Sequence, residues 1–448
     1  MSTAVLWFRR DLRLSDNPAL VEAVREADDV VGLFCLDPAL LGPSGAPRRA
    51  HLFDCLRAFD ASMDGNLVVR EGDPRRVVPE LAVEVEAASV HLAEDFGPYG
   101  RRRDDDVAAR LVEAGIEVVR TGSPYAVRPG TIHNKAGDRY KVFTPFSRAW
   151  HDHGWPDPVR RPAGIPWRSA PGDGIPDAPD LGGVELPRAG EDAAGHRLDH
   201  FLRAKVEGYA DDRDRPGEDA TSRLSPDLRW GTLHPRQILA RLGGSDGERT
   251  FATELCWREF YADVLFHVPE SARESMDQAV GAMTWDRGAG ADELFDAWVQ
   301  GRTGFPIVDA GMRQLVAEGW MHNRVRMITA SFLVKDLHLD WQRGARWFMQ
   351  HLVDGDLASN QHGWQWTAGT GTDAAPFFRV FNPTTQGERF DPDGAYVRRY
   401  VPELAPVPAR WIHRPHEAPD GPPEGYPAPV VDHAEEREEA LRRYQATR

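Results

Sequence analysis

Short apolar runs alternate with helical patterns along the first part of the chain. The apolar runs lie at 4–7, 30–36, 67–69, 90–92 and 116–119. Helix-like spacing of apolar residues covers 18–24, 51–61, 76–85 and 105–114. Strands that alternate with helices in this way predict βαβ units and a parallel sheet. We therefore expect an N-terminal α/β domain with a doubly wound sheet of about five strands.

The pattern changes twice after the last of these runs. Residues 121–195 are rich in Pro, Gly and Asp and show little periodicity. A structureless loop of this length is uncommon inside a domain, which predicts a connection between two domains. From Ala194 onward the spacing of apolar residues is helical. We expect an α/β domain at 1–125, an interdomain connection at 126–195 and an all-α domain at 196–448.

Length and composition agree with a two-domain protein of the cytoplasm. A chain of 448 residues exceeds one ordinary hydrophobic core. No apolar run approaches the roughly 20 residues of a membrane-spanning helix, and no signal-peptide pattern opens the chain. Cys35, Cys55 and Cys256 lack the spacing of metal ligands, so we expect no disulfide and no metal site. The abundance of Ala, Gly, Arg and Pro suggests a GC-rich bacterial genome.

The net charge of −16 argues against a protein that coats nucleic acid without specificity. The only lysines are Lys135, Lys141, Lys205 and Lys335, so arginine carries nearly all the positive charge. A guanidinium group can bind phosphate through two parallel hydrogen bonds. A local phosphate-binding face is therefore compatible with the acidic composition.

The densest group of chemically functional residues lies between two helical patterns. Asp354, Asp356, Asn360, Trp364 and Trp366 fall close together there. Residues two apart on a helix do not face each other, so the two tryptophans should point into different compartments. Taken singly, Asp354 and Asp356 could equally well be helix caps. A pair of tryptophans is by itself more often part of a hydrophobic core than a contact with a cofactor.

Three further patterns are ambiguous when taken alone. Gly369-Thr370-Gly371 is a weak phosphate-loop signal, because no predicted strand precedes it. The hydroxyl-rich turn at 221–225 could cap a helix or hold an anion at the start of that helix. At helical spacing, Glu254, Trp257, Arg258 and Tyr261 share one face, which is more often an amphipathic surface stripe than a site.

Together these motifs resemble the photolyase and cryptochrome family. The similarity is nearly continuous from Gly304 to Leu404, and it includes the segments 7–18 and 140–146. It implies FAD, bound in a bent form in the helical domain, and an antenna chromophore in the α/β domain. The segment 94–104 is similar to members that carry a deazaflavin, so we expect a deazaflavin rather than methenyltetrahydrofolate.

The resemblance also implies which residues hold the cofactor. It pairs Asp354 with Arg326, and it puts Asp356 near the N1 and C2 edge of the flavin and Asn360 opposite N5. The residues implied to hold the diphosphate are Tyr209, Thr221, Ser222, Arg223, Leu224 and Ser225. The tryptophans implied to carry an electron to the excited, oxidised flavin, in order from flavin to surface, are Trp364, Trp341 and Trp285.

Asn360 favours a repair enzyme within the family. A neutral amide tolerates a protonated N5, which the reduced flavin needs, whereas plant-type photoreceptors carry Asp at this position and the insect type carries Cys. The neighbouring Gln361-His362 departs from the commoner Asn-Gly, which leaves the tuning near N5 open.

The resemblance implies light-driven repair of cyclobutane pyrimidine dimers in UV-damaged DNA, by electron transfer from excited reduced FAD. The dimer must leave the duplex to react. The implied walls of its pocket are Trp257 and Trp366, and the implied floor is Asn323, Met327 and Glu254. The predicted helix that carries Glu254 and Trp257 also contributes Arg258 and Tyr261 to the implied DNA site. The candidates for phosphate contacts are Arg213, Arg324, Arg379 and Gln386. In an apolar pocket, Glu254 should be protonated and donate a hydrogen bond to a pyrimidine carbonyl.

Three alternatives remain open at this point. A cryptochrome-type blue-light photoreceptor without repair activity shares the fold and the flavin. A 6–4 photolyase needs a histidine pair over the lesion, and His362 is one residue away from the expected place. An ordinary flavin oxidoreductase lacks support, because no nicotinamide fingerprint is present. We expect a monomer without an obligate protein partner.

Overall fold

The computed structural model describes residues 2–372 and 379–447, which form two compact units. The first unit comprises Met1–Gly182, Leu186–Glu207 and Ser222–Pro269. The second comprises Gly183–Glu185, Gly208–Thr221 and Glu270–Arg448. No helix in the described ranges is both long and apolar enough to cross a membrane.

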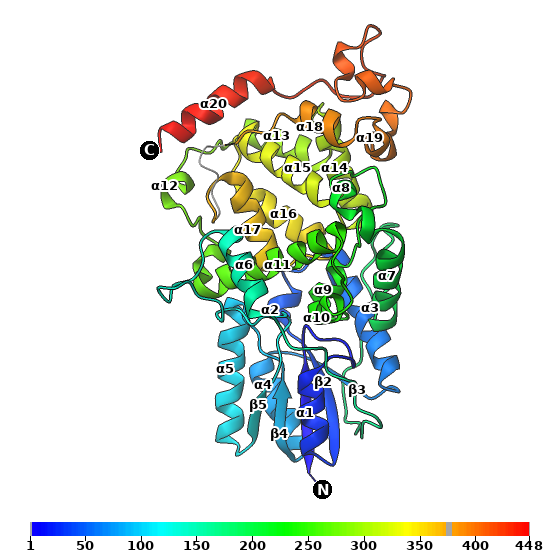
Figure 1. Cartoon of the computed structure of the whole chain (residues 1–448), viewed down its shortest axis with the longest axis vertical. Coiled ribbons are helices and arrows are strands. Elements are labelled where there is room, and N and C mark those ends of the chain that lie inside the picture. The colour runs from blue at the N-terminus through cyan, green and yellow to red at the C-terminus, as the bar shows by residue number, and fades with distance from the viewer. Residues whose placement is uncertain (1, 373–378, 448) are drawn as a thin grey trace. The chain divides into compact units, whose positions relative to one another are not determined.

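The first unit contains a five-stranded sheet with the order β3-β2-β1-β4-β5 (Figure 1). All four strand pairs are parallel. The strands are β1 (Thr3–Phe8), β2 (Asp29–Leu36), β3 (Leu67–Glu71), β4 (Ala87–Leu92) and β5 (Glu117–Arg120). Their places agree with the five apolar runs, so the predicted doubly wound sheet is confirmed.

Helices cover both faces of this sheet. They are α1 (Pro18–Glu26), α3 (Ala46–Ser62), α4 (Pro74–Glu84) and α5 (Pro98–Glu113). Alternate residues of β1 enter different cores: Leu6 packs in one cluster with Leu52 of α3, and Val5 packs in another with Leu81 of α4. Burial on both faces explains why the strands read as continuous apolar runs rather than as alternating patterns.

The compact units do not coincide with the segments 1–125, 126–195 and 196–448. Most of 126–195 and the helix α11 (Asp246–His267) belong to the first unit. The buried carboxylate of Glu259 on α11 provides one reason. It accepts hydrogen bonds from the backbone N–H groups of Ala126 and Val127 and from the Trp150 indole, the last at 2.7 Å.

Five more α-helices complete the first unit within the described residues. They are α2 (Pro38–Leu41), α6 (Phe143–His153), α7 (Glu191–Ala204), α9 (Ser225–Trp230) and α10 (Pro235–Leu239). A 3-10 helix, η1 (Val206–Gly208), leads to the first helix of the second unit.

The second unit is helical, as expected. Its longer helices are α13 (Ala289–Val299), α14 (Pro306–Glu318), α15 (Asn323–Lys335), α16 (Trp341–His351), α17 (Leu357–Ala368) and α20 (His433–Gln445). The shorter ones are α8 (Tyr209–Asp212), α12 (Gln278–Gly281), α18 (Pro383–Phe390) and α19 (Ala395–Tyr400). The 3-10 helices are η2 (Pro269–Ala272), η3 (Pro402–Leu404), η4 (Ala409–Trp411) and η5 (Pro415–Glu417).

Polar side chains fix where the central helices begin. His322, Asp340 and Asp356 cap α15, α16 and α17 by accepting hydrogen bonds from backbone N–H groups of the first turn. The helix α16 therefore begins at Trp341, directly after Asp340. These caps position the N-termini that carry the candidate site.

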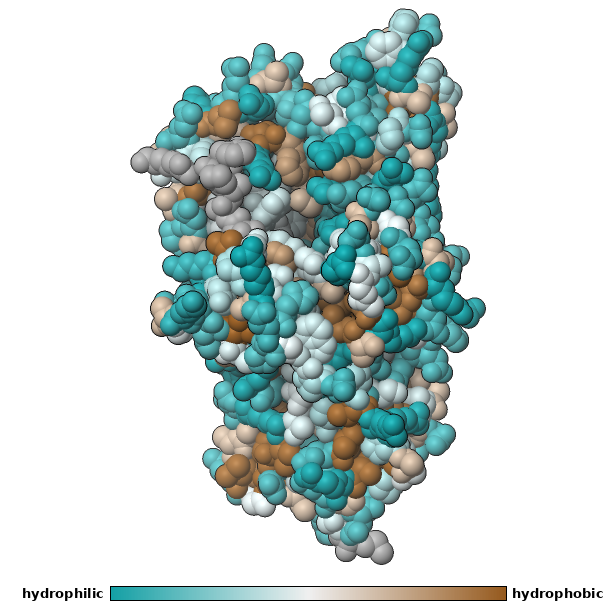
Figure 2. Space-filling model, viewed as in Figure 1, coloured by the Kyte–Doolittle hydropathy of each residue, from teal (hydrophilic) through white to brown (hydrophobic). Residues whose placement is uncertain are grey.

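The face shown in Figure 2 is mostly hydrophilic, and apolar side chains form only scattered groups on it. Large hydrophobic side chains that are exposed within the described residues are Leu40, Val83, Val112, Val142, Val316 and Leu357. Scattered apolar residues of this kind are normal for a protein surface and do not indicate a binding site.

Candidate functional site

Two carboxylates define the start of α17. Asp356 caps the helix, and its Oδ1 accepts a hydrogen bond from Ser359 N at 3.1 Å. Asp354 is buried and pairs with the guanidinium of Arg326 at 2.9 Å, which confirms the expected partner. Arg326 Nε in turn donates a hydrogen bond to the carbonyl oxygen of Met321 at 2.8 Å. The ion pair therefore has a fixed place beside α17.

The same stretch presents two oxygen atoms that are ready to accept hydrogen bonds. The Oδ1 atom of Asp354 is buried, and no donor among the described residues reaches it. Asn360 Nδ2 donates hydrogen bonds to Ala345 O at 3.1 Å and to Gln361 Oε1 at 2.9 Å. Among the described residues, no donor forms a hydrogen bond with Asn360 Oδ1. A reduced isoalloxazine ring carries several N–H donors, so these acceptors fit the flavin that the resemblance implies.

The departure at Gln361-His362 ties α17 to η2. Gln361 Nε2 donates to Ala272 O at 2.7 Å. His362 is buried, with Nε2 3.0 Å from Ser271 Oγ and Nδ1 2.7 Å from Ala358 O. Because its ring is enclosed in the helical unit, His362 gives no support to the histidine pair of a 6–4 photolyase.

The predicted tryptophan chain lies within the second unit. Trp364 and Trp341 are buried in its core, and Trp285 is half-buried against that core. Trp341 Nε1 donates to Ser275 Oγ at 3.2 Å. Gly344, one turn after Trp341, allows α16 to approach the Trp364 ring: a Cβ built there would lie 2.1 Å from Cη2. Trp285 is therefore the least buried of the three tryptophans.

Trp298 is a neighbour of Trp364 that the sequence analysis missed. Their ring centroids are 6.2 Å apart, and the Phe348 ring lies 5.0 Å from the Trp364 ring. Trp298 is fully buried, and its Nε1 donates to Thr329 O at 3.1 Å. No local signal distinguishes it, because the contact joins two helices that are far apart in sequence.

Trp366 is half-buried, whereas Trp364 is buried; that they point into different compartments stays a prediction. Asn323 is exposed at the start of α15, and Met327 is half-buried one turn later. Gln386 on α18 is half-buried, and Arg379 is exposed. All five belong to the second unit.

Two of the candidate phosphate ligands flank one carboxylate. Arg324 pairs with Asp214 at 2.6 Å, and its guanidinium lies 4.5 Å from the centre of the Phe390 ring. Arg213 lies 4.0 Å from Asp214 and 5.8 Å from the ring of Tyr209, which is buried at the start of α8. The structure therefore brings both arginines together around Asp214.

The hydroxyl-rich turn precedes a helix, as expected. Ser225 begins α9, and Ser222 Oγ accepts from Leu224 N at 3.4 Å. Arg223 has a positive φ of 50°, and Leu224 is buried. Thr221 ends one segment of the second unit, and Ser222 begins a segment of the first. A phosphate-binding role for the turn stays a prediction.

On α11, Trp257 is already stacked within its own unit. Its ring lies 3.5 Å from that of Phe143 on α6, at an angle of 7°. The ring of Tyr261 lies 5.5 Å away on the next turn, and Glu254 is half-buried on the turn before. The Trp257 ring therefore belongs to an aromatic cluster with Phe143 and Tyr261.

Arg258 does not share the surroundings of Trp257. It donates to the carbonyl oxygens of Pro124 and Leu228, both at 3.1 Å, and lies 4.6 Å from the Tyr125 ring. Arg258 and Trp257 were expected to share one face of α11, but their side chains contact different segments. Arg258 binds the segment before α6 within the first unit.

The pattern Gly369-Thr370-Gly371 belongs to a helix end. Gly369 follows α17 in the left-handed conformation, with a φ of 81°, and its N–H donates to Trp366 O. The phosphate-loop interpretation of this pattern is therefore wrong, because the glycine serves as a C-cap. Residues 373–378, within the stretch that resembles the family, lie outside the described residues.

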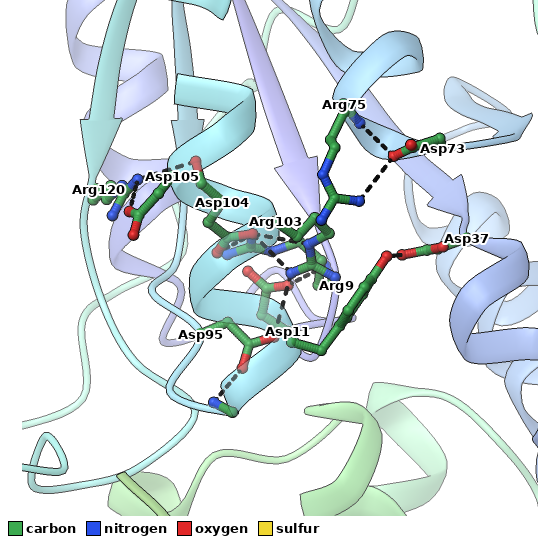
Figure 3. Close-up of polar contacts among 12 residues, drawn as sticks. Arg9, Asp11, Asp37, Asp73, Arg75, Asp95, Arg103, Asp104, Asp105 and Arg120 are labelled. Atoms are coloured by element: carbon green, nitrogen blue, oxygen red, sulfur yellow. Dashed lines mark hydrogen bonds and ion pairs between the residues drawn. The ribbon is translucent and has the colours of Figure 1, made fainter. Parts of the chain in front are cut away.

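Charged residues gather at the carboxyl ends of β1, β2 and β4, where a doubly wound sheet binds ligands. Figure 3 shows Arg103 of α5 between Arg9, Asp95 and Asp104. Asp104 pairs with Arg103 and Arg9, both at 2.8 Å, and Asp95 lies 3.3 Å from Arg103. Burial raises the pKa of Asp95, but the charges of Arg103 and its neighbours outweigh it, so the pKa lies below its usual value.

An aromatic ring and two unmatched polar atoms complete this sheet edge. The guanidinium groups of Arg9 and Arg103 lie 4.5 and 5.0 Å from the centre of the Trp7 ring. Tyr99 OH donates to Asp37 Oδ2 at 2.6 Å. The buried Trp7 Nε1 and Asp11 Oδ2 have no partner among the described residues. A planar heteroaromatic ligand with polar edges fits these groups.

Comparisons with known proteins cover the whole chain. Residues 4–163 match the family described as DNA photolyase, and residues 251–446 match the FAD binding domain of DNA photolyase. A deoxyribodipyrimidine photo-lyase of Halobacterium salinarum is 40% identical over 99% of this chain and 99% of its own length. A bacterial class III photolyase from Agrobacterium tumefaciens has a TM-score of 0.93 and 39% identity, covering 100% of this chain and 98% of that one. A Synechocystis cryptochrome has a TM-score of 0.89 and 28% identity over 99% of each chain.

Proposed function

This chain belongs to the photolyase and cryptochrome family, and we propose that it is a light-driven enzyme that repairs cyclobutane pyrimidine dimers in DNA. The observation that carries the proposal is the amide of Asn360, whose Oδ1 is available to accept a hydrogen bond. The 40% identity to a deoxyribodipyrimidine photo-lyase over nearly the full length supports the same activity. UV-damaged DNA is then the partner, and the enzyme works as a cytoplasmic monomer at the nucleoid without an obligate protein partner.

FAD is the cofactor of the helical half, where the FAD-binding family matches. When bound and reduced, FAD supplies an electron donor that blue light activates. The Asp354–Arg326 ion pair would stand beside it, and Asp356 would face its N1 and C2 edge. Asn360 would accept a hydrogen bond from N5–H. The proposed diphosphate ligands are Tyr209, Thr221, Ser222, Arg223, Leu224 and Ser225.

We propose that Trp364, Trp341 and Trp285 carry an electron from the protein surface to the cofactor. Trp285 is half-buried whereas Trp341 and Trp364 are buried, which supports its place at the surface end of the path. The close approach at Gly344 supports electron transfer between Trp341 and Trp364, because the missing side chain lets α16 pack directly against the Trp364 ring.

Each unit contributes residues that we propose to bind DNA. Trp257 of the first unit offers one aromatic wall for the dimer, and Trp366 of the second unit offers another. Glu254, Asn323 and Met327 line the floor, with Tyr261 beside Trp257. The flanking phosphates are bound by residues that carry amide or guanidinium donors, namely Arg213, Arg324, Arg379 and Gln386. Arg258 supports this site from within the first unit.

We propose that an antenna chromophore binds at the sheet edge around Trp7 and Arg103. The unmatched Trp7 Nε1 and Asp11 Oδ2 support a ligand with both acceptor and donor atoms. A deazaflavin is preferred over methenyltetrahydrofolate because segment 94–104 resembles that of members with a deazaflavin. Reconstitution with each chromophore tests this, since the preferred one should remain bound through gel filtration.

Dimer repair tests the proposed function directly. The purified protein is reduced and mixed with an oligothymidine that contains one cyclobutane dimer, and base absorbance is followed under blue light. We expect turnover in light and none in darkness. Photoreduction of bound flavin without dimer repair would contradict the proposal and favour a cryptochrome-type photoreceptor.

A further inference from the structure

Gln361 links the amide of Asn360 to a backbone carbonyl on a different element. Gln361 Oε1 accepts from Asn360 Nδ2 at 2.9 Å, and Gln361 Nε2 donates to Ala272 O of η2 at 2.7 Å. The second hydrogen of Asn360 Nδ2 points to Ala345 O of α16 at 3.1 Å. Two amides and two carbonyls therefore form one continuous chain of hydrogen bonds.

The chemistry of its ends fixes the direction of this chain. A backbone carbonyl can only accept, so Ala272 O requires the Nε2 side of Gln361 and Ala345 O requires the Nδ2 side of Asn360. Neither amide can turn over without facing one carbonyl oxygen with another. Asn360 Oδ1 is therefore held on the side away from both partners.

We propose that Gln361 is a positioning residue that locks the Asn360 amide with its oxygen toward flavin N5. This inference rests on the proposed function, which sets Asn360 opposite that atom. An inverted amide would present N–H to N5 and favour a flavin whose N5 is unprotonated. The locked amide instead accepts from N5–H, so Gln361 favours the reduced cofactor.

Gln342 provides a matched control on the neighbouring helix. Its Nε2 donates to Arg273 O at 2.7 Å, the same kind of tie at the same distance as that from Gln361 to Ala272. Gln342 has no hydrogen bond to Asn360. Replacing it removes a link between a helix and the segment after η2 but leaves the Asn360 amide untouched.

The test measures the reduction potential of bound FAD by equilibration with a reference dye in the dark, without DNA. Gln361→Met removes both hydrogen bonds at similar volume, and Gln361→Ala removes them without adding bulk. In both variants we expect the ratio of reduced to oxidised flavin, at one dye potential, to fall about five- to tenfold, the size of one hydrogen bond. For two electrons this is a shift of about 20–30 mV to more negative potential.

Gln342→Met should leave the ratio within about twofold of wild type. An unchanged ratio in both Gln361 variants would overturn the inference, and so would an equal shift in Gln342→Met. Repair by the wild-type enzyme is assayed separately. Because the potential is read without light or dimer, a failure of the proposed repair and a failure of the Gln361 lock give different results.

Discussion

Asp354 is a buried carboxylate that depends on one cation. Its side chain is 3% exposed and lies 2.9 Å from the Arg326 guanidinium, while its other oxygen has no partner among the described residues. Removing the cation would leave a buried charge without compensation. The cost of breaking such a pair is larger than the net stabilisation that the pair contributes.

We therefore expect Arg326→Met to lower the free energy of unfolding by about 2 kcal/mol and to reduce the FAD retained on purification. Denaturant titration and the flavin-to-protein absorbance ratio measure the two effects. Arg414→Met is the control, because Arg414 pairs with Glu388 at the surface, where such pairs contribute about 0–1 kcal/mol. Equal effects of the two substitutions would contradict the special role of Asp354.

Lys335 predicts a pH dependence of stability. It is buried at the end of α15, where its ammonium group donates to Arg379 O, and burial lowers its pKa to about 7. In the unfolded chain the pKa returns to about 10.4. Between these values the unfolded state binds more protons, so stability rises with pH.

Relative to Lys335→Met, the wild-type free energy of unfolding should therefore rise by about 1 kcal/mol per pH unit from pH 7 to 10. Below pH 7 the difference should be constant. Denaturant titrations at several pH values measure it, with Lys135→Met as control because Lys135 is exposed. A difference that is independent of pH across this window would contradict the assignment.

At the scale of elements, two glycines on α16 and α17 have opposite roles. Gly344 sits where α16 meets the Trp364 ring, and an added Cβ would lie 2.1 Å from that ring and 2.6 Å from Leu333 Cδ2. Gly363 lies inside α17 with nothing within 4 Å of an added Cβ. The first glycine permits close packing, whereas the second only weakens its helix.

Gly344→Ala should therefore destabilise the protein by about 2 kcal/mol, and Gly363→Ala should stabilise it by about 0.5–1 kcal/mol. Thermal unfolding measures both. Gly344→Ala should also slow photoreduction of bound flavin by displacing Trp364, and Trp364→Phe should abolish it. Normal photoreduction in Trp364→Phe would contradict the proposed electron path, whatever the thermal results.

At the scale of the whole molecule, the sequence predicts elements well and partners poorly. The five strands could be located because burial on both faces leaves continuous apolar runs, as in Val30 to Leu36. The cap Asp356 could be located because capping acts within three residues. Contacts between distant segments, such as Trp298 with Trp364 or Arg258 with Pro124, leave no local pattern and appear only once the chain has folded.

The overall charge raises a question that also belongs to the whole molecule. A net charge of −16 repels DNA, yet the proposed substrate is DNA. At physiological salt the screening length is about 8 Å, so phosphates respond mainly to the arginines they touch. Binding should therefore depend on a few local guanidinium groups rather than on the average charge.

Arg379 is the exposed member of the proposed phosphate ligands in the second unit, so Arg379→Gln tests this directly. Each phosphate contact adds about 0.9 to the slope of log affinity against log salt concentration, because it releases condensed cations. We expect the substitution to reduce that slope by about 1 and to weaken binding equally for damaged and undamaged duplexes. Arg25→Gln on α1, where Arg25 pairs with Glu22 and Glu26, should leave the slope unchanged. A loss confined to damaged DNA would mean that Arg379 contacts the lesion rather than a flanking phosphate.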